Sequence, residues 1–77
     1  MKARKVLPAV VKGSGKSMQS ISLEMNRVRT YLANTIKKQA VPRADILAEI
    51  ADTCGYDLIL RNRSSGDEII IDPPRRE

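Results

Sequence analysis

The chain has 77 residues, enough for one small domain, and its core must be aliphatic because its aromatic residues are two tyrosines. Its 14 Lys and Arg residues outnumber its 9 Asp and Glu residues, and the net charge of +5 indicates either a polyanionic partner or ordinary solubilising charge. One cysteine and no histidine exclude a zinc finger, a histidine-based catalytic triad and a disulfide framework. Apolar runs are too short for a membrane span or a secretory signal, so we expect a cytoplasmic protein.

The first predicted helix covers residues 5–12 and follows a basic N-terminal arm, residues 1–5. Pro8 is tolerated because it falls in the first turn. Residues 13–15, with the sequence Gly-Ser-Gly, are expected to end the helix. The apolar residues that recur at helical spacing are Val6, Leu7, Val10 and Val11.

Two short helices joined by a tight turn are predicted next. The first covers residues 18–25, with Ser17 as its N-cap. Asn26 ends it, because asparagine accepts left-handed backbone angles at modest cost. The second covers residues 28–37 and points Leu32 inward.

A fourth helix follows, and its apolar stripe is the clearest periodicity in the chain. Pro42 opens the helix, and Gly55 stands where a helix end favours a residue with positive φ. The stripe consists of Ile46, Leu47, Ile50, Ala51 and Cys54. Because Cys54 lies on this stripe, we expect it to act as a small buried apolar residue, with a redox switch as the alternative.

The C-terminal segment, residues 56–72, changes to a strand pattern. Residues 56–63 and 68–72 are rich in Leu and Ile, and a turn signal at 64–67 predicts a β-hairpin. A lone hairpin is marginal in water. We therefore expect two hairpins to pair or stack across a two-fold axis, with folding back onto the chain's own helices as the alternative. The expected interface has Leu58, Leu60, Ile69 and Ile71 on one face and Ile59 and Ile70 on the other.

The two short helices and their turn, residues 17–37, have the pattern of a DNA-binding helix-turn-helix. Ser22 is the small residue needed where the two helices cross, and Asn26 suits the turn. The apolar residues that would lock the helices together are Ile21, Met25 and Leu32. The polar residues expected on the outer face of the second helix, at positions i, i+1 and i+5, are Arg29, Thr30 and Asn34.

Residues 17–34 resemble the Xre/Cro/CI (lambda-repressor-like) helix-turn-helix family. Residues 28–33, Val-Arg-Thr-Tyr-Leu-Ala, look like the family's frequent Ser-Arg-Ser-Tyr-Leu-Ser. Residues 50–56 look like the family's Ile-Ala…Leu-Gly-Tyr helix ending, so the likeness covers residues 6–56, about two thirds of the chain. The resemblance implies a mainly α fold: a four-helix lambda-repressor-like domain over residues 1–77, with a C-terminal β-hairpin.

The sequence departs from the family pattern at four places. Met18 replaces the usual glutamine and is followed by Gln19, Asn26 replaces the turn glycine, and Arg27 replaces an apolar residue. The hairpin takes the place of the usual fifth helix. The resemblance implies that the base-reading residues are Arg29, Thr30 and Asn34. The phosphate-contacting residues that it implies are Lys16, Ser17, Gln19, Arg27, Tyr31, Lys37 and Lys38.

We expect a sequence-specific transcriptional repressor of the phage or mobile-element type, which binds a palindromic double-stranded DNA operator as a homodimer. An antitoxin of a toxin–antitoxin pair and a protein inhibitor that reuses the helix-turn-helix fold remain as alternatives. No cofactor or metal is expected. An enzyme is the least favoured class, because no acid–base or nucleophile pair is visible. The carboxylates expected on exposed helical faces are Glu24, Asp45, Glu49 and Asp52.

Overall fold

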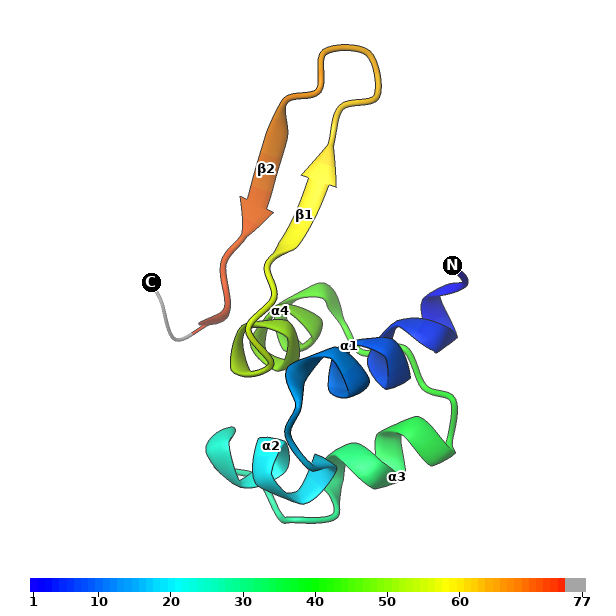
Figure 1. The fold of residues 1–77 in the computed structure, drawn as a ribbon, viewed down its shortest axis with the longest axis vertical. Helices are drawn as coiled ribbons and strands as arrows, with labels where there is room; N and C mark the ends of the chain where they lie inside the picture. Colours follow the sequence, from blue (N-terminus) through cyan, green and yellow to red (C-terminus); the bar gives the residue numbers. More distant parts are fainter. Residues whose placement is uncertain (75–77) are drawn as a thin grey trace.

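The fold is mainly α, with a two-stranded antiparallel hairpin at its C-terminal end, as predicted (Figure 1). The computed structural model describes residues 1–74, so residues 75–77 of the predicted domain lie outside the described part. The elements in chain order are the 3-10 turn η1 (Ala3–Lys5), α1 (Val6–Ser14), α2 (Met18–Glu24), α3 (Tyr31–Lys37), α4 (Ala44–Thr53), β1 (Leu58–Arg61) and β2 (Glu68–Ile71). No helix in this part of the chain is long and apolar enough to cross a membrane.

Helix α1 continues farther than the sequence predicted. Gly13 and Ser14 belong to the helix, and only Gly15 ends it, with a φ of 72°. The Ser14 hydroxyl donates a hydrogen bond to the Val11 carbonyl at 2.6 Å and so supports the last turn. A Cβ at Gly13 would meet the hydroxyl end of the Tyr56 side chain, which would have to shift.

Helix α2 begins as predicted, because the Ser17 side chain accepts a hydrogen bond from the Ser20 backbone N–H at 3.0 Å. Asn26 has the expected left-handed conformation, with a φ of 58°. The predicted start of the third helix at residue 28 is wrong, because α3 begins at Tyr31. Residues 27–30 form an irregular connection between α2 and α3 instead.

Three helices end with the same hydrogen-bonding pattern. After α4, the backbone N–H of Tyr56 donates to the Ala51 carbonyl at 2.8 Å, and that of Gly55 donates to the Asp52 carbonyl at 3.1 Å. The same pair of bonds closes α2 and α3, where the left-handed residue is Asn26 or Gln39. This Schellman ending satisfies carbonyls that a helix end leaves unpaired and sets a sharp change of chain direction.

The core lies between the four helices and is aliphatic, as the composition predicted. Its buried members are Leu7, Ile21, Met25, Leu32, Ile50 and Cys54, which come from all four helices and the two turns that follow α2 and α4. Cys54 is therefore a buried residue of the apolar stripe, as expected. Glu49 is 9% exposed, so the prediction of an exposed face for this carboxylate is wrong.

The hairpin extends away from the helices, and α4 packs against both of its strands (Figure 1). The strands are shorter than predicted, and their register pairs Leu58 with Ile71 and Ile59 with Ile70. This register confirms which apolar residues share each face, because directly paired residues point to the same side. Leu58 and Ile71 are half-buried near the helices. The exposed residues of the predicted interface are Ile59, Leu60, Ile69 and Ile70.

Candidate nucleic-acid interface

The contact between α2 and α3 positions the candidate site. Ser22 of α2 is fully buried, and its hydroxyl donates a hydrogen bond to the Met18 carbonyl at 2.8 Å. The same hydroxyl accepts a hydrogen bond from the Leu32 backbone N–H at 3.1 Å. Leu32 is the second residue of α3, where the backbone N–H has no partner within the helix. Ser22 therefore caps the first turn of α3 from the neighbouring helix and fixes where α3 begins.

Because α3 begins at Tyr31, two of the three predicted base-reading residues lie outside the helix on which they were predicted. Arg29 and Thr30 precede α3, so their predicted place on the outer face of that helix is wrong. Asn34 lies on α3 as expected and is exposed. Thr30 occupies the N-cap position without a side-chain capping bond. Arg29 is exposed and forms no ion pair with any residue in the described part of the chain.

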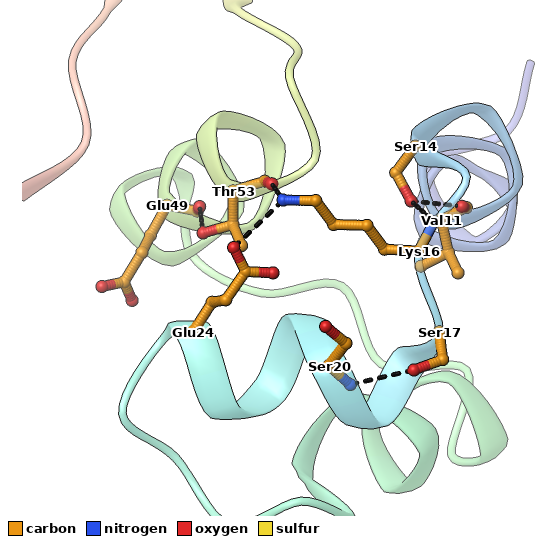
Figure 2. Close-up of polar contacts among 8 residues, drawn as sticks. All are labelled: Val11, Ser14, Lys16, Ser17, Ser20, Glu24, Glu49 and Thr53. Atoms are coloured by element: carbon orange, nitrogen blue, oxygen red, sulfur yellow. Dashed lines mark hydrogen bonds and ion pairs between the residues drawn. The ribbon is translucent and has the colours of Figure 1, made fainter.

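Lys16, which the sequence predicts as a phosphate-contacting residue, has two partners within the protein. Its Nζ donates to the Glu24 carboxylate at 3.1 Å and to the Thr53 carbonyl at 3.0 Å (Figure 2). Thr53 is the last residue of α4, where a cation is favoured by the helix dipole. Lys16 thus links the residues before α2 to the end of α2 and to the end of α4. These contacts help to hold the two helices in their relative positions.

Arg27, also predicted as a phosphate-contacting residue, has partners within the protein. Its guanidinium carbon lies 4.6 Å from the centre of the Tyr31 ring, and its Nη2 lies 3.6 Å from the Glu49 carboxylate. Its Nε is buried and has no hydrogen-bond partner among the described residues. Because Arg27 packs on Tyr31 and pairs with α4, both residues hold the α2–α3 connection in place.

The remaining predicted phosphate-contacting residues lie on the surface. Ser17 and Gln19 are exposed at the start of α2, and the Ser17 hydroxyl is used as the cap. Lys37 and Lys38 are exposed at the C-terminal end of α3. The exposed polar positions therefore run from the start of α2 past Arg29 to the far end of α3.

Two further cations, which the sequence did not indicate as phosphate-contacting residues, line a cavity of about 270 Å³. It is lined by Arg4, Lys5, Pro8, Ile36 and Gln39, so it lies between the N-terminal turn and the end of α3. Arg4 and Lys5 were expected only as part of a basic arm. Their position beside α3 depends on the folding of η1 onto α1, which no local pattern indicates.

The charges are divided unevenly along the chain. Residues 1–43 carry ten Lys and Arg residues and one carboxylate, a formal charge of +9. Residues 44–74 carry two arginines and seven carboxylates, a formal charge of −5. Figure 1 shows α2 and α3 at one end of the long axis and the hairpin at the other. The net positive charge therefore lies in the segment that contains α2 and α3.

Cys54 is the one group in the described residues with a resolved shift of its pKa. Burial raises the pKa of the thiol, while a hydrogen bond with Ser14 and the nearby Lys16 lower it in part. We expect the folded thiol to react slowly with Ellman's reagent at about pH 8 and rapidly in denaturant. Equal rates in the two conditions would contradict the buried position.

The raised pKa also predicts a pH dependence of stability. A thiol whose pKa is higher in the folded state stabilises that state below its ordinary pKa of 9.0, and this contribution is lost as the pH rises above it. Thermal unfolding of the wild type and Cys54→Ala, compared at neutral and alkaline pH, isolates this effect. The alkaline loss should be larger in the wild type.

The geometry thus combines a buried α2–α3 contact, exposed polar residues along both helices and a basic end of the molecule. Lys16, Arg27 and Tyr31 support this arrangement through their contacts with other residues of the protein. Comparison of the chain with family models, curated proteins and solved structures found no match in any of the three.

Proposed function

We propose that this chain is a sequence-specific regulator of transcription that binds double-stranded DNA through a helix-turn-helix formed by α2 and α3. The observation that carries the proposal is the +9 charge of residues 1–43, the segment that contains both helices. The buried Ser22, the left-handed Asn26 and the exposed Asn34 on α3 are the residue types that such a unit requires. A lambda-repressor-like arrangement of the four helices fits this proposal.

In this proposal the start of α3 enters the major groove. Arg29 is long enough to reach guanine from the connection before α3, and its guanidinium offers two parallel donors to O6 and N7. Asn34 can make a bidentate contact with adenine, and Thr30 a contact with a thymine methyl group. Two arrays of cations position the protein on phosphates without reading sequence: Lys37 and Lys38 at the end of α3, and Arg4 and Lys5 beside them.

Regulation would follow from occupancy of an operator in the DNA. A homodimer would present two α3 helices and read a palindromic operator, and the bound protein would block access of RNA polymerase to a promoter. Neutralised phosphates release counterions, so affinity should fall steeply as the salt concentration rises.

The test begins with selection of preferred duplexes from a random DNA pool by the wild-type protein. Fluorescence anisotropy then measures affinity for the selected duplex and for a scrambled one at two salt concentrations. We expect Arg29→Ala to weaken binding to the selected duplex by about 1–3 kcal/mol and to relax the preference at one base position. Arg63→Ala, which removes the same charge in the hairpin turn, is the matched control and should change neither.

A phosphate-contacting residue should behave differently. Lys37→Ala is expected to weaken binding to both duplexes equally and to reduce the salt slope by about one charge. If no duplex is enriched by the selection, or if Arg29→Ala and Arg63→Ala have equal effects, the proposed base reading is wrong.

A further inference from the structure

The hairpin leaves four large aliphatic side chains in solvent and two strand edges without a neighbour. Ile59, Leu60, Ile69 and Ile70 are 38%, 60%, 67% and 50% exposed. The sheet has two strands within residues 1–74, so the outer edges of β1 and β2 are unpaired. Such an edge favours pairing with another strand, and an isolated hairpin is only marginally stable. The charges next to the strands distinguish between the two edges.

The backbone of β1 shows which residues face outward. Asn62, directly after β1, donates its N–H to the Asp67 carbonyl at 2.8 Å. In an antiparallel pair, alternate residues direct their N–H and C=O groups toward the partner strand. Even-numbered residues of β1 therefore face β2. Ile59 and Arg61 direct their backbone groups away from it, and Asp57, one residue before β1, continues this alternation.

A second copy of β1 can satisfy these outward groups in one register. If two β1 strands pair antiparallel around Ile59, Ile59 lies opposite itself on the two-fold axis. Asp57 then lies opposite Arg61 of the second copy, and this pair occurs twice. All three outward-facing residues meet outward-facing residues, and both charged pairs have opposite signs. Leu58 also lies opposite Leu60 of the second copy, which joins the apolar faces of the two hairpins.

The outer edge of β2 cannot pair with a second copy of itself in a register that places opposite charges against each other. By the same alternation its outward residues are Glu68 and Ile70, with Asp72 one residue beyond the strand. Pairing of two β2 strands around Ile70 would place Glu68 opposite Asp72 twice. These like charges directly opposite each other are destabilising. The charge pattern thus favours β1 and disfavours β2 as the self-pairing edge.

We infer that two copies of this chain associate through β1 and form one four-stranded antiparallel sheet with the order β2–β1–β1–β2. The partner is a second copy because its β1 strand supplies an Arg61 opposite Asp57 and an Asp57 opposite Arg61. The tip of the hairpin extends away from the helices (Figure 1). The inference does not rest on DNA binding and is tested without DNA.

A charge exchange tests the register. Sedimentation equilibrium of the wild type should show twice the 8.6 kDa chain mass. Asp57→Arg and Arg61→Asp each place like charges opposite each other twice, so each should weaken the dimer by roughly tenfold. The double variant restores both pairs with their signs exchanged and should recover most of the affinity. Circular dichroism checks that all variants keep their secondary structure.

The rescue separates pairing between chains from effects within one hairpin. Arg61 faces Glu68 across the hairpin, and this neighbour remains mismatched in the double variant. A rescue therefore reports the Asp57 partner in the second copy. A wild-type monomer up to millimolar concentration, or a double variant that dimerises no better than either single variant, overturns the inference.

Cross-linking locates the axis independently. Ile59→Cys should be joined to its copy by a short bismaleimide, because the two positions are directly opposite. Ile70→Cys is the matched control, since it lies on the same face but on the outer strand, and it should give little product. Native Cys54 is 6% exposed and provides the background in the wild type. Product from Ile70→Cys in place of Ile59→Cys would show that a different edge pairs.

Discussion

Replacing Leu32 with alanine is expected to lower the free energy of unfolding by about 2–5 kcal/mol. Leu32 is fully buried in the first turn of α3 and belongs to the same core cluster as Ile21, Met25 and Ile50. Truncation removes apolar contacts and leaves a cavity that the surrounding helices fill only in part. Since small domains have total stabilities of about 5–15 kcal/mol, the change removes a large share of the stability.

Urea unfolding followed by far-UV circular dichroism measures this loss. Leu23→Ala is the matched control, because Leu23 lies on α2 but is 54% exposed. Its replacement should change the stability by no more than about 0.5 kcal/mol. Equal losses for the two variants would show that Leu32 is not part of the core that holds α3 against α2.

The features that could be predicted from the sequence are those fixed by neighbouring residues. Ser17 could be assigned as the cap of α2 because the capping bond reaches only three residues ahead. Gly55 marks the end of α4 because a positive φ favours glycine. The sharing of faces in the hairpin also follows from local alternation, once the turn has set the register.

The start of α3 could not be predicted in this way. Residues 28–30 have no strong helix-breaking residue, so the helical pattern extends naturally back to Val28. Ser22 decides where α3 starts, because its hydroxyl accepts a hydrogen bond from the Leu32 N–H, ten positions later in the sequence. A tertiary hydrogen bond of this kind leaves no periodic signal. As a result, the sequence pattern predicts Arg29 and Thr30 in the helix, whereas they belong to the connection before it.

The contacts that Lys16 and Arg27 make within the protein could not be predicted for the same reason, because their partners are distant in sequence. A lysine at the start of α2 and an arginine after a turn both look like exposed cations in a basic chain. Lys16 instead reaches the Thr53 carbonyl, 37 positions away, and Arg27 reaches Glu49. The structure also buries Glu49, which the sequence predicts on an exposed helical face. Its burial depends on how α4 packs against the α2–α3 connection, which the sequence of α4 alone does not specify.

Exposed ion pairs contribute little to the free energy of unfolding, so the exposure of these contacts matters. Lys16 and Glu24 are 40% and 46% exposed, and such a pair contributes about 0–1 kcal/mol. Glu49 has an 11% exposed side chain, and its partner Arg27 is also stacked on Tyr31. The contact between Arg27 and Glu49 is therefore the less solvent-exposed link between α4 and the connection that carries Arg29.

Replacing Ser22 with valine is expected to lower the free energy of unfolding by about 2–6 kcal/mol, since two costs add. The Leu32 N–H loses its buried acceptor, which costs about 1–3 kcal/mol, and the larger side chain overfills the crossing of α2 and α3 at a similar cost. Ser22→Ala carries only the first cost and should lose about 1–3 kcal/mol.

Two measurements separate these costs. Urea unfolding gives the order of stability, with Ser20→Ala on the exposed side of α2 as a control that should change by less than about 0.5 kcal/mol. Amide hydrogen exchange reports the Leu32 N–H directly, and it should lose protection in Ser22→Ala more than neighbouring α3 amides do. If Leu32 keeps its protection in Ser22→Ala, the serine hydroxyl does not cap α3, and another contact must set the position of Arg29.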